Sequence, residues 1–126
     1  MNTTAITARR LACLLADSAD GIPADLAAVE LITRHDHFLH QPGFRRVIAA
    51  ARAPFTGEPV LAIRWKAAIY ALNTGRLPST RSEETILRIA ASLGDDDIPV
   101  HLRPSLGSLD HRNIALVTSA ITRANG

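Results

Sequence analysis

The sequence predicts an all-α, single-domain bundle of about five to six short helices over residues 1–126. Three observations predict this class. Apolar residues recur three and four positions apart, as at Ile86 and Ile89, and residues with this spacing share one face of a helix. Helix-ending and helix-starting residues bound the apolar runs, for example Gly94 and Asp110. No stretch shows the sustained apolar–polar alternation of a half-buried strand.

The first two helices are predicted from about Thr4 to Asp17 and from Pro23 to His35–Asp36. The run Ser18-Ala19-Asp20-Gly21 is typical of a turn and ends the first helix. Pro23 suits the first position of the second helix, because a proline there gives up no helical hydrogen bond. The expected buried faces carry Ala8, Leu11, Ala12 and Leu15, then Leu26, Val29, Leu31 and Ile32.

Two further helices are predicted in the middle of the chain. The third is short and basic, spans Gly43–Arg52, and is followed by an exposed connector over 53–59. It is expected to bury Phe44, Val47 and Ile48. The fourth, Val60–Asn73, is apolar on two sides, so we expect it to run through the centre of the fold. Trp65 and Tyr70 lie on its apolar faces and are expected in the core.

The fifth helix is predicted to begin at a cap made by Thr80 with Glu83, or by Ser82 alone, and to end at Gly94. A serine or threonine followed three residues later by a glutamate satisfies two backbone donors that have no partner at a helix start.

The positions of the prolines determine which helical segments are predicted in the last third of the chain. Residues 98–104 predict only one or two irregular helical turns, because Pro104 would remove a backbone donor inside a longer helix. The last helix is predicted to start after Asp110, which serves as its cap, and to run to about Arg123.

Composition indicates one cytoplasmic domain. The 126 residues, 47% of them hydrophobic, suffice for a single core. The single cysteine, Cys13, excludes an intramolecular disulfide, and its Ala/Leu surroundings predict a small, inert core residue. The apolar run around Cys13 is too short for an export signal, and no run approaches the roughly 20 apolar residues of a membrane span.

Positive charge gathers in the middle of the chain. Between Gln41 and Arg88 there are eight basic and three acidic side chains, a net charge of +5, whereas the whole chain carries +2. Uneven charge of this kind points to a binding surface. The candidate binding residues are Arg45, Arg46, Arg52, Arg64 and Lys66.

The basic segment is open to two interpretations. Arginine pairs with phosphate through two parallel hydrogen bonds, and an aromatic such as Trp65 or Tyr70 could stack on a base, which favours nucleic acid. Both aromatics lie on apolar helix faces, however, and spaced arginines are also typical of an ordinary solvated surface. A helix-turn-helix is not expected, because the three aspartates at 95–97 would repel phosphates.

Residues that carry catalysis or bind metals form no recognisable pattern. His35, His37 and His40 crowd together with Asp36, but paired cysteines and a His-Glu-x-x-His motif are absent, so no metal site is expected. Such histidines are more often solvated, cap a helix C-terminus or interact with the helix dipole. Ser108, Asp110 and His111 contain the letters of a hydrolytic triad without its Gly-x-Ser-x-Gly motif, and Asp110 is accounted for as a cap. The glycines form no phosphate-binding loop, and no cofactor or small-molecule substrate is indicated.

Two segments carry a family resemblance. The first runs from Arg9-Arg10-Leu11-Ala12-Cys13-Leu14-Leu15-Ala16-Asp17 through Gly21-Ile22-Pro23-Ala24-Asp25-Leu26-Ala27, and the second is Leu109-Asp110-His111-Arg112-Asn113-Ile114-Ala115-Leu116-Val117. They resemble small uncharacterised helical proteins of GC-rich actinobacteria. The resemblance implies a helical fold over most of the chain but no activity and no binding residues.

The function expected from the sequence is that of a non-catalytic, cytoplasmic helical module that binds another macromolecule through its basic surface. A protein partner, or self-association, is the leading interpretation, and an acidic partner would be favoured by long-range attraction. The alternative is a nucleic-acid-binding protein that contacts phosphates through the Arg-rich middle segment.

Overall fold

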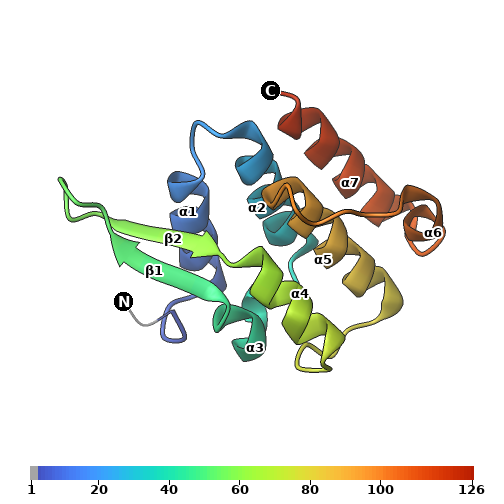
Figure 1. Cartoon of the computed structure of the whole chain (residues 1–126), viewed down its shortest axis with the longest axis horizontal. Coiled ribbons are helices and arrows are strands. Elements are labelled where there is room, and N and C mark those ends of the chain that lie inside the picture. The colour runs from blue at the N-terminus through green and yellow to red at the C-terminus, as the bar shows by residue number, and fades with distance from the viewer. Residues whose placement is uncertain (1–2) are drawn as a thin grey trace.

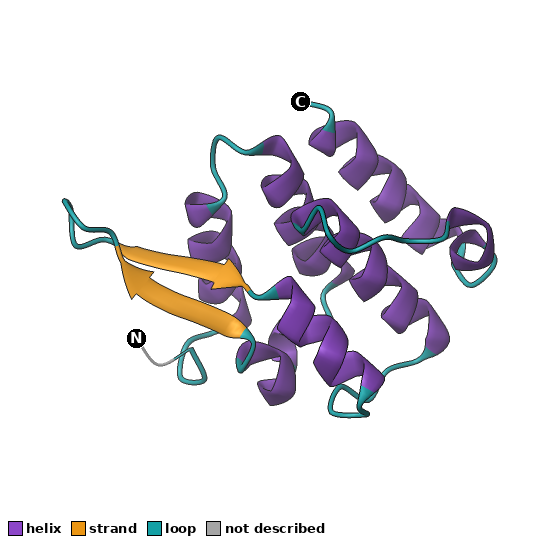
Figure 2. Cartoon of the chain, viewed as in Figure 1, coloured by secondary structure: helices purple, strands orange, loops and turns teal. Residues whose placement is uncertain are grey.

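The computed structural model describes residues 3–126 and shows a mostly helical domain with one small sheet (Figures 1 and 2). The α-helices are α1 (Ala8–Ser18), α2 (Pro23–His35), α3 (Pro42–Arg45), α4 (Trp65–Asn73), α5 (Arg81–Gly94), α6 (Leu102–Leu106) and α7 (His111–Ala124). A 3-10 turn, η1 (Phe38–His40), precedes α3. The strands β1 (Ile48–Arg52) and β2 (Pro59–Ile63) form an antiparallel hairpin between α3 and α4.

The core is built around α2, which packs against both α5 and α7 (Figure 1). Apolar residues cover more than one side of α2, as a central helix requires. Its buried apolar residues are Ala27, Ala28, Val29, Leu31 and Ile32. The expectation that the helix near 60–73 would be central is therefore wrong. α4 is one nine-residue helix on the side of α5, and its Tyr70, expected in the core, is 61% exposed.

The hairpin replaces two predicted helical segments, Gly43–Arg52 and the start of Val60–Asn73. In the first, only residues 43–45 are helical, as part of α3, and β2 takes the place of the first turn of the second. Phe44, Val47 and Ile48 are buried as expected, but Ile48 is buried from a strand. Their spacing imitates a helix because a short helix ends and a strand begins between them.

Cross-strand pairing explains why the hairpin is stable beside the helices. Ile48 lies opposite Ile63 and Ala50 opposite Leu61, and the three large side chains of these pairs are buried. β2 packs against α1, where the hydroxyl of Ser18 accepts a 2.9 Å hydrogen bond from the backbone N–H of Leu61. The hairpin therefore joins the core through one of its two faces.

The loop of the hairpin spans residues 53–58. It closes through the N–H of Ala53, which donates to the Glu58 carbonyl at 2.9 Å. Gly57 has φ +69°, a left-handed conformation that favours glycine. Arg52 adds a 2.9 Å hydrogen bond from Nη1 to the Gly57 carbonyl. This loop coincides with the connector expected at 53–59.

The predicted caps of the later helices are confirmed. Thr80 Oγ1 accepts from the Glu83 N–H at 3.3 Å, and Glu83 Oε1 accepts from the Thr80 N–H at 2.7 Å, which is a complete capping box. Asp110 Oδ1 caps α7 by accepting from the Asn113 N–H at 2.8 Å. α1 begins later than expected, at Ala8, because Thr7 is its cap.

Cys13 lies on the exposed side of α1, so the expectation of a core cysteine is wrong. The buried stripe of this helix is formed by Leu11, Leu14 and Leu15 instead. Across residues 3–126, no helix has the length and apolar character needed to cross a bilayer.

Candidate interaction surface

Arg45 is part of the fold and not of an open basic surface. Its side chain is half-buried, and its guanidinium donates three hydrogen bonds to backbone carbonyls. Nε reaches Leu39 at 2.7 Å, and Nη1 reaches Thr3 at 3.0 Å and Ile6 at 2.6 Å. These bonds tie the segment before α1 and the turn η1 to the end of α3. The neighbouring Arg46 is exposed, and its side chain has no hydrogen-bond or ion-pair partner among residues 3–126.

The other candidate cations differ in how accessible their charge is. Lys66 forms a 2.8 Å ion pair with Asp97, and this hydrogen bond raises the pKa of Lys66 and lowers that of Asp97. Arg52, at the end of β1, is exposed and uses one nitrogen on the loop. Arg64 follows β2, is exposed, and has no side-chain partner in the described part of the chain. Arg46, Arg52 and Arg64 therefore keep charge available along the hairpin.

One face of the hairpin is apolar and uncovered. Because cross-strand partners share a face, Ala49 with Ala62 and Ala51 with Val60 form the face opposite the buried one, and all four are exposed. Phe55, at the tip, is 100% exposed. Figure 1 shows the hairpin projecting beyond the helices, with its tip pointing away from them. We call Ala49, Ala51, Phe55, Val60 and Ala62, together with Arg46, Arg52 and Arg64, the hairpin surface.

Trp65 and Tyr70, the two aromatics considered for base stacking, are not part of the hairpin surface. Trp65 is only 9% exposed and packs in the core, so its indole offers no open face for a base. Tyr70 is exposed on α4, where the guanidinium carbon of Arg76 lies 5.8 Å from its ring centre. This pair belongs to α4 and the turn after it, and not to the hairpin.

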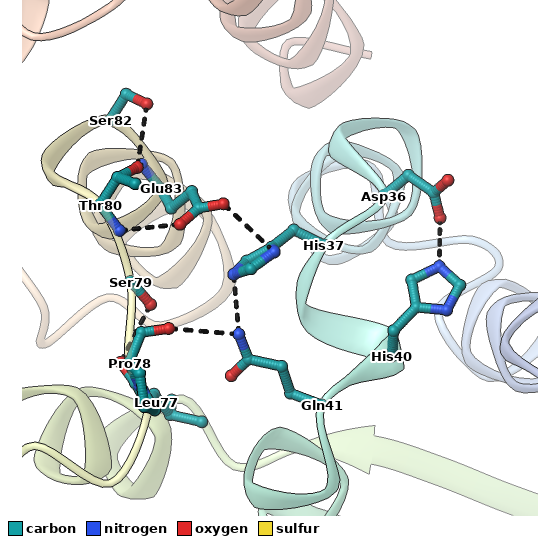
Figure 3. A network of polar contacts seen from close by, with 10 residues as sticks. All are labelled: Asp36, His37, His40, Gln41, Leu77, Pro78, Ser79, Thr80, Ser82 and Glu83. Carbon is teal, nitrogen blue, oxygen red and sulfur yellow. Dashed lines mark hydrogen bonds and ion pairs between the residues drawn. The ribbon is translucent and has the colours of Figure 1, made fainter.

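The clustered histidines serve two different contacts (Figure 3). His37 Nδ1 lies 3.2 Å from Glu83 Oε2, and His37 Nε2 lies 2.7 Å from the side-chain amide of Gln41. Gln41 also donates to the Pro78 carbonyl at 3.3 Å. His40 turns the other way, to a 2.7 Å contact with Asp36 (Figure 3). This network joins the turn after α2 to the capping box of α5, and it holds two connectors in place.

Glu83 is the centre of that network. One carboxylate oxygen accepts from the Thr80 N–H and the other faces His37. The pKa of Glu83 is lowered, first by the backbone hydrogen bond of Thr80 and further by the nearby charge of His37. Both oxygens are engaged, so the carboxylate acts here as a helix cap and an ion-pair partner.

His35 and Asn113 are the buried polar side chains whose atoms lack partners. His35 Nδ1 and Asn113 Oδ1 make no hydrogen bond within residues 3–126. His35 is 8% exposed, and burial lowers the pKa of its imidazole, with a further lowering from His37. His35 is therefore not solvated, which was one of the roles expected for the histidines; it is the last residue of α2 and packs near the Phe38 ring.

Ser108, Asp110 and His111, whose residue types match a hydrolytic triad, make separate contacts in the structure. Ser108 Oγ lies 2.7 Å from Thr85 Oγ1 and donates to the Ser105 carbonyl at 2.9 Å. Asp110 caps α7, and His111 is exposed at the first position of that helix. Within residues 3–126, no group of three or more His, Cys, Asp or Glu side chains is arranged to hold a metal ion.

The sequence predicted the basic segment but not the β-hairpin on which it lies. Alternating exposure at Val60, Leu61, Ala62 and Ile63 is the signal of a strand, yet all four residues are apolar, so their letters show no alternation. Comparison with models of known families, with curated proteins and with solved structures finds no match. The fold and the surface therefore define the class: a mostly helical domain with a projecting β-hairpin.

Proposed function

We propose that this domain is a protein-binding module that contacts an acidic partner protein through the hairpin surface. The observation that carries this proposal is the outer face of the hairpin, where Ala49, Ala51, Val60 and Ala62 are all exposed. A contiguous apolar area on a projecting element is a common feature of protein interfaces. The fully exposed Phe55 adds an aromatic side chain, the type enriched at interface centres.

Charge supports the choice of partner. Arg46, Arg52 and Arg64 are exposed on or beside the hairpin, and Glu58 is the one acidic residue between them in the sequence. An acidic partner is drawn to such a surface by long-range attraction and fits it by local complementarity. The apolar face also favours protein over nucleic acid, because phosphate contacts do not need it.

Site-specific photo-crosslinking tests the proposal. The photoreactive phenylalanine analogue benzoylphenylalanine, placed at Phe55, is expected to capture a discrete protein in cells that produce the domain. The matched control carries the analogue at Leu106, which is also exposed but lies on α6, across the molecule from the hairpin (Figure 1). The captured protein is then purified and its binding to the domain measured directly.

Charge reversal completes the test. Arg46→Glu with Arg64→Glu is expected to weaken binding of the purified partner, because both side chains lack internal partners in the described chain. Arg81→Glu with Arg103→Glu is the control, since both arginines are exposed away from the hairpin. Absence of a protein adduct at position 55, or capture of nucleic acid there with affinity that falls steeply with salt, would refute the proposal.

A further inference from the structure

The direction of the backbone groups in β1 follows from the hairpin register. The N–H of Arg64 bonds the Val47 carbonyl and the N–H of Ala53 bonds the Glu58 carbonyl, each at 2.9 Å. Hydrogen-bonded and non-hydrogen-bonded pairs alternate along an antiparallel ladder. Ala49 and Ala51 therefore face β2 with their backbone groups. Ile48, Ala50 and Arg52 direct theirs to the opposite edge of the strand.

This outer edge of β1 is open. Ala50 and Arg52 are exposed, and their backbone N–H and C=O groups have no partner within residues 3–126. Edge strands are usually protected by proline, lysine or a covering element. β1 has a single charged residue, at its end, and its alanines leave the backbone accessible to another chain.

The edge of β2 differs in each of these respects. Pro59 has no N–H, and the N–H of Leu61 is bonded to Ser18 on α1, against which β2 packs. Of the two edges, β1 is the one that can accept a further strand. The two edges of one hairpin thus differ because only one is docked on a helix.

A small open pocket of about 170 Å³ lies over both strands, mainly on the face that carries Ala50 and Leu61. It is lined by Ala50, Ala51, Arg52, Pro59 and Leu61. A cavity of roughly 150 Å³ can hold a benzene ring, so this pocket has room for one side chain. In strand addition the main chain supplies affinity, and pockets for alternate side chains supply specificity.

We infer that the open edge of β1 binds an extended acidic segment of the partner protein as a third strand. This inference rests on the proposed function and names how the partner binds. The backbone groups of Ala50 and Arg52 pair with the segment, one of its side chains fills the pocket, and an aspartate or glutamate meets the Arg52 guanidinium. An acidic segment fits this edge because Arg46, Arg52 and Arg64 give the hairpin region a positive charge.

Peptide selection followed by binding measurements tests the inference. A library of random 12-residue peptides is displayed and selected on the wild-type protein, and enriched peptides are synthesised for fluorescence anisotropy. We expect them to be acidic and rich in strand-forming residues. Failure to enrich any peptide, or enrichment of peptides without acidic residues, would overturn the inference.

Ala50→Pro separates edge pairing from other contacts. Proline removes the outward N–H but no ladder bond to β2, so the hairpin should keep its fold, as circular dichroism will check. Affinity for the selected peptide is expected to fall at least about tenfold, whereas the control Ala50→Ser, which keeps the N–H, stays within about threefold. Equal binding by Ala50→Pro would overturn the inference. In the wild type, hydrogen exchange at the Ala50 and Arg52 amides should slow on peptide binding, and unchanged exchange would also overturn it.

The outcomes also separate this inference from the proposed function. If the partner captured at Phe55 binds Ala50→Pro as it binds the wild type but is lost on charge reversal, the hairpin binds protein without strand addition. If neither change affects the partner, both proposals fail. Dimerisation of the protein in analytical ultracentrifugation, lost in Ala50→Pro, would show that a second copy occupies the edge, which contradicts the acidic segment.

Discussion

The indole of Trp65 occupies the space that a β-carbon on Gly94 would need. Indole atoms Cε2 and Cδ1 lie 2.5 and 2.8 Å from that position, and Nε1 lies closer still. Gly94 is the last residue of α5, and Trp65 is the first residue of α4. The glycine thus lets two helices that pack side by side approach each other at one end. Its role is to admit the indole as well as to end the helix.

Gly94→Ala is therefore expected to destabilise the domain. The added methyl group meets a rigid ring in the core, and overpacking of this kind costs about 1–3 kcal/mol in the free energy of unfolding. Urea denaturation followed by circular dichroism measures the change. Gly107→Ala is the matched control, since its nearest neighbour would be the Pro104 carbonyl at 3.8 Å. The control should be neutral or stabilised by up to about 1 kcal/mol. Equal effects of the two changes would contradict the Trp65 contact.

The two adjacent arginines should separate stability from binding. Arg45→Ala removes three hydrogen bonds from a charged donor to backbone carbonyls, and we expect a loss of about 2 kcal/mol or more in the free energy of unfolding. Arg46→Ala, at an exposed side chain, should change it by less than about 0.5 kcal/mol. Thermal and urea unfolding of both variants decide the matter. A loss of stability in Arg46→Ala equal to that in Arg45→Ala would argue against the assigned roles.

Glu83 should contribute more to stability than its neighbour Glu84. Glu83→Ala removes one half of the capping box and the ion pair with His37, for an expected cost of about 1–2 kcal/mol. Glu84→Ala keeps the cap and is the control. Because the pKa of Glu83 is lowered on folding, its contribution is present above the ordinary value near 4.5 and is lost as the pH falls through the lower folded value. The difference between wild type and Glu83→Ala should therefore shrink in acid.

His35 should make stability depend on pH between about 7 and 5.5. Burial lowers the pKa of His35 in the folded state, and His37 and Arg112 lower it further against the opposing effect of Glu83 and Asp110. The unfolded chain then takes up a proton near pH 6.5 that the folded protein resists, so the free energy of unfolding falls as the pH drops through that region.

His35→Leu isolates this effect. Leucine removes the titrating imidazole, whose buried Nδ1 has no partner in the described chain, and leaves every other titratable group in place. The fall in the free energy of unfolding between pH 7 and 5.5 should become smaller in this variant. His101→Gln, at an exposed histidine, should keep the wild-type profile. An unchanged profile in His35→Leu would contradict a buried, neutral His35.

Local signals predicted the helices that use local interactions. The apolar spacing of α2 and α5 and the caps at Thr80 and Asp110 depend on residues within four positions of one another, so the sequence contains them completely. The sequence also indicated the segment that carries the candidate surface, because the net charge of a segment follows from its residues alone. Those features do not depend on how the helices pack against one another.

The sequence alone therefore determined the helical class, most helix ends and the basic middle of the chain. Only the tertiary structure decided that Ile48 to Ile63 forms a hairpin, because alanine-rich strands with no apolar–polar alternation are stabilised by cross-strand pairing and by docking on α1. It also decided which arginines remain available, since the acceptors of Arg45 on Thr3 and Ile6 are 42 and 39 residues away in the chain. The physical reason is the same in both cases: these contacts form between residues that only folding brings together.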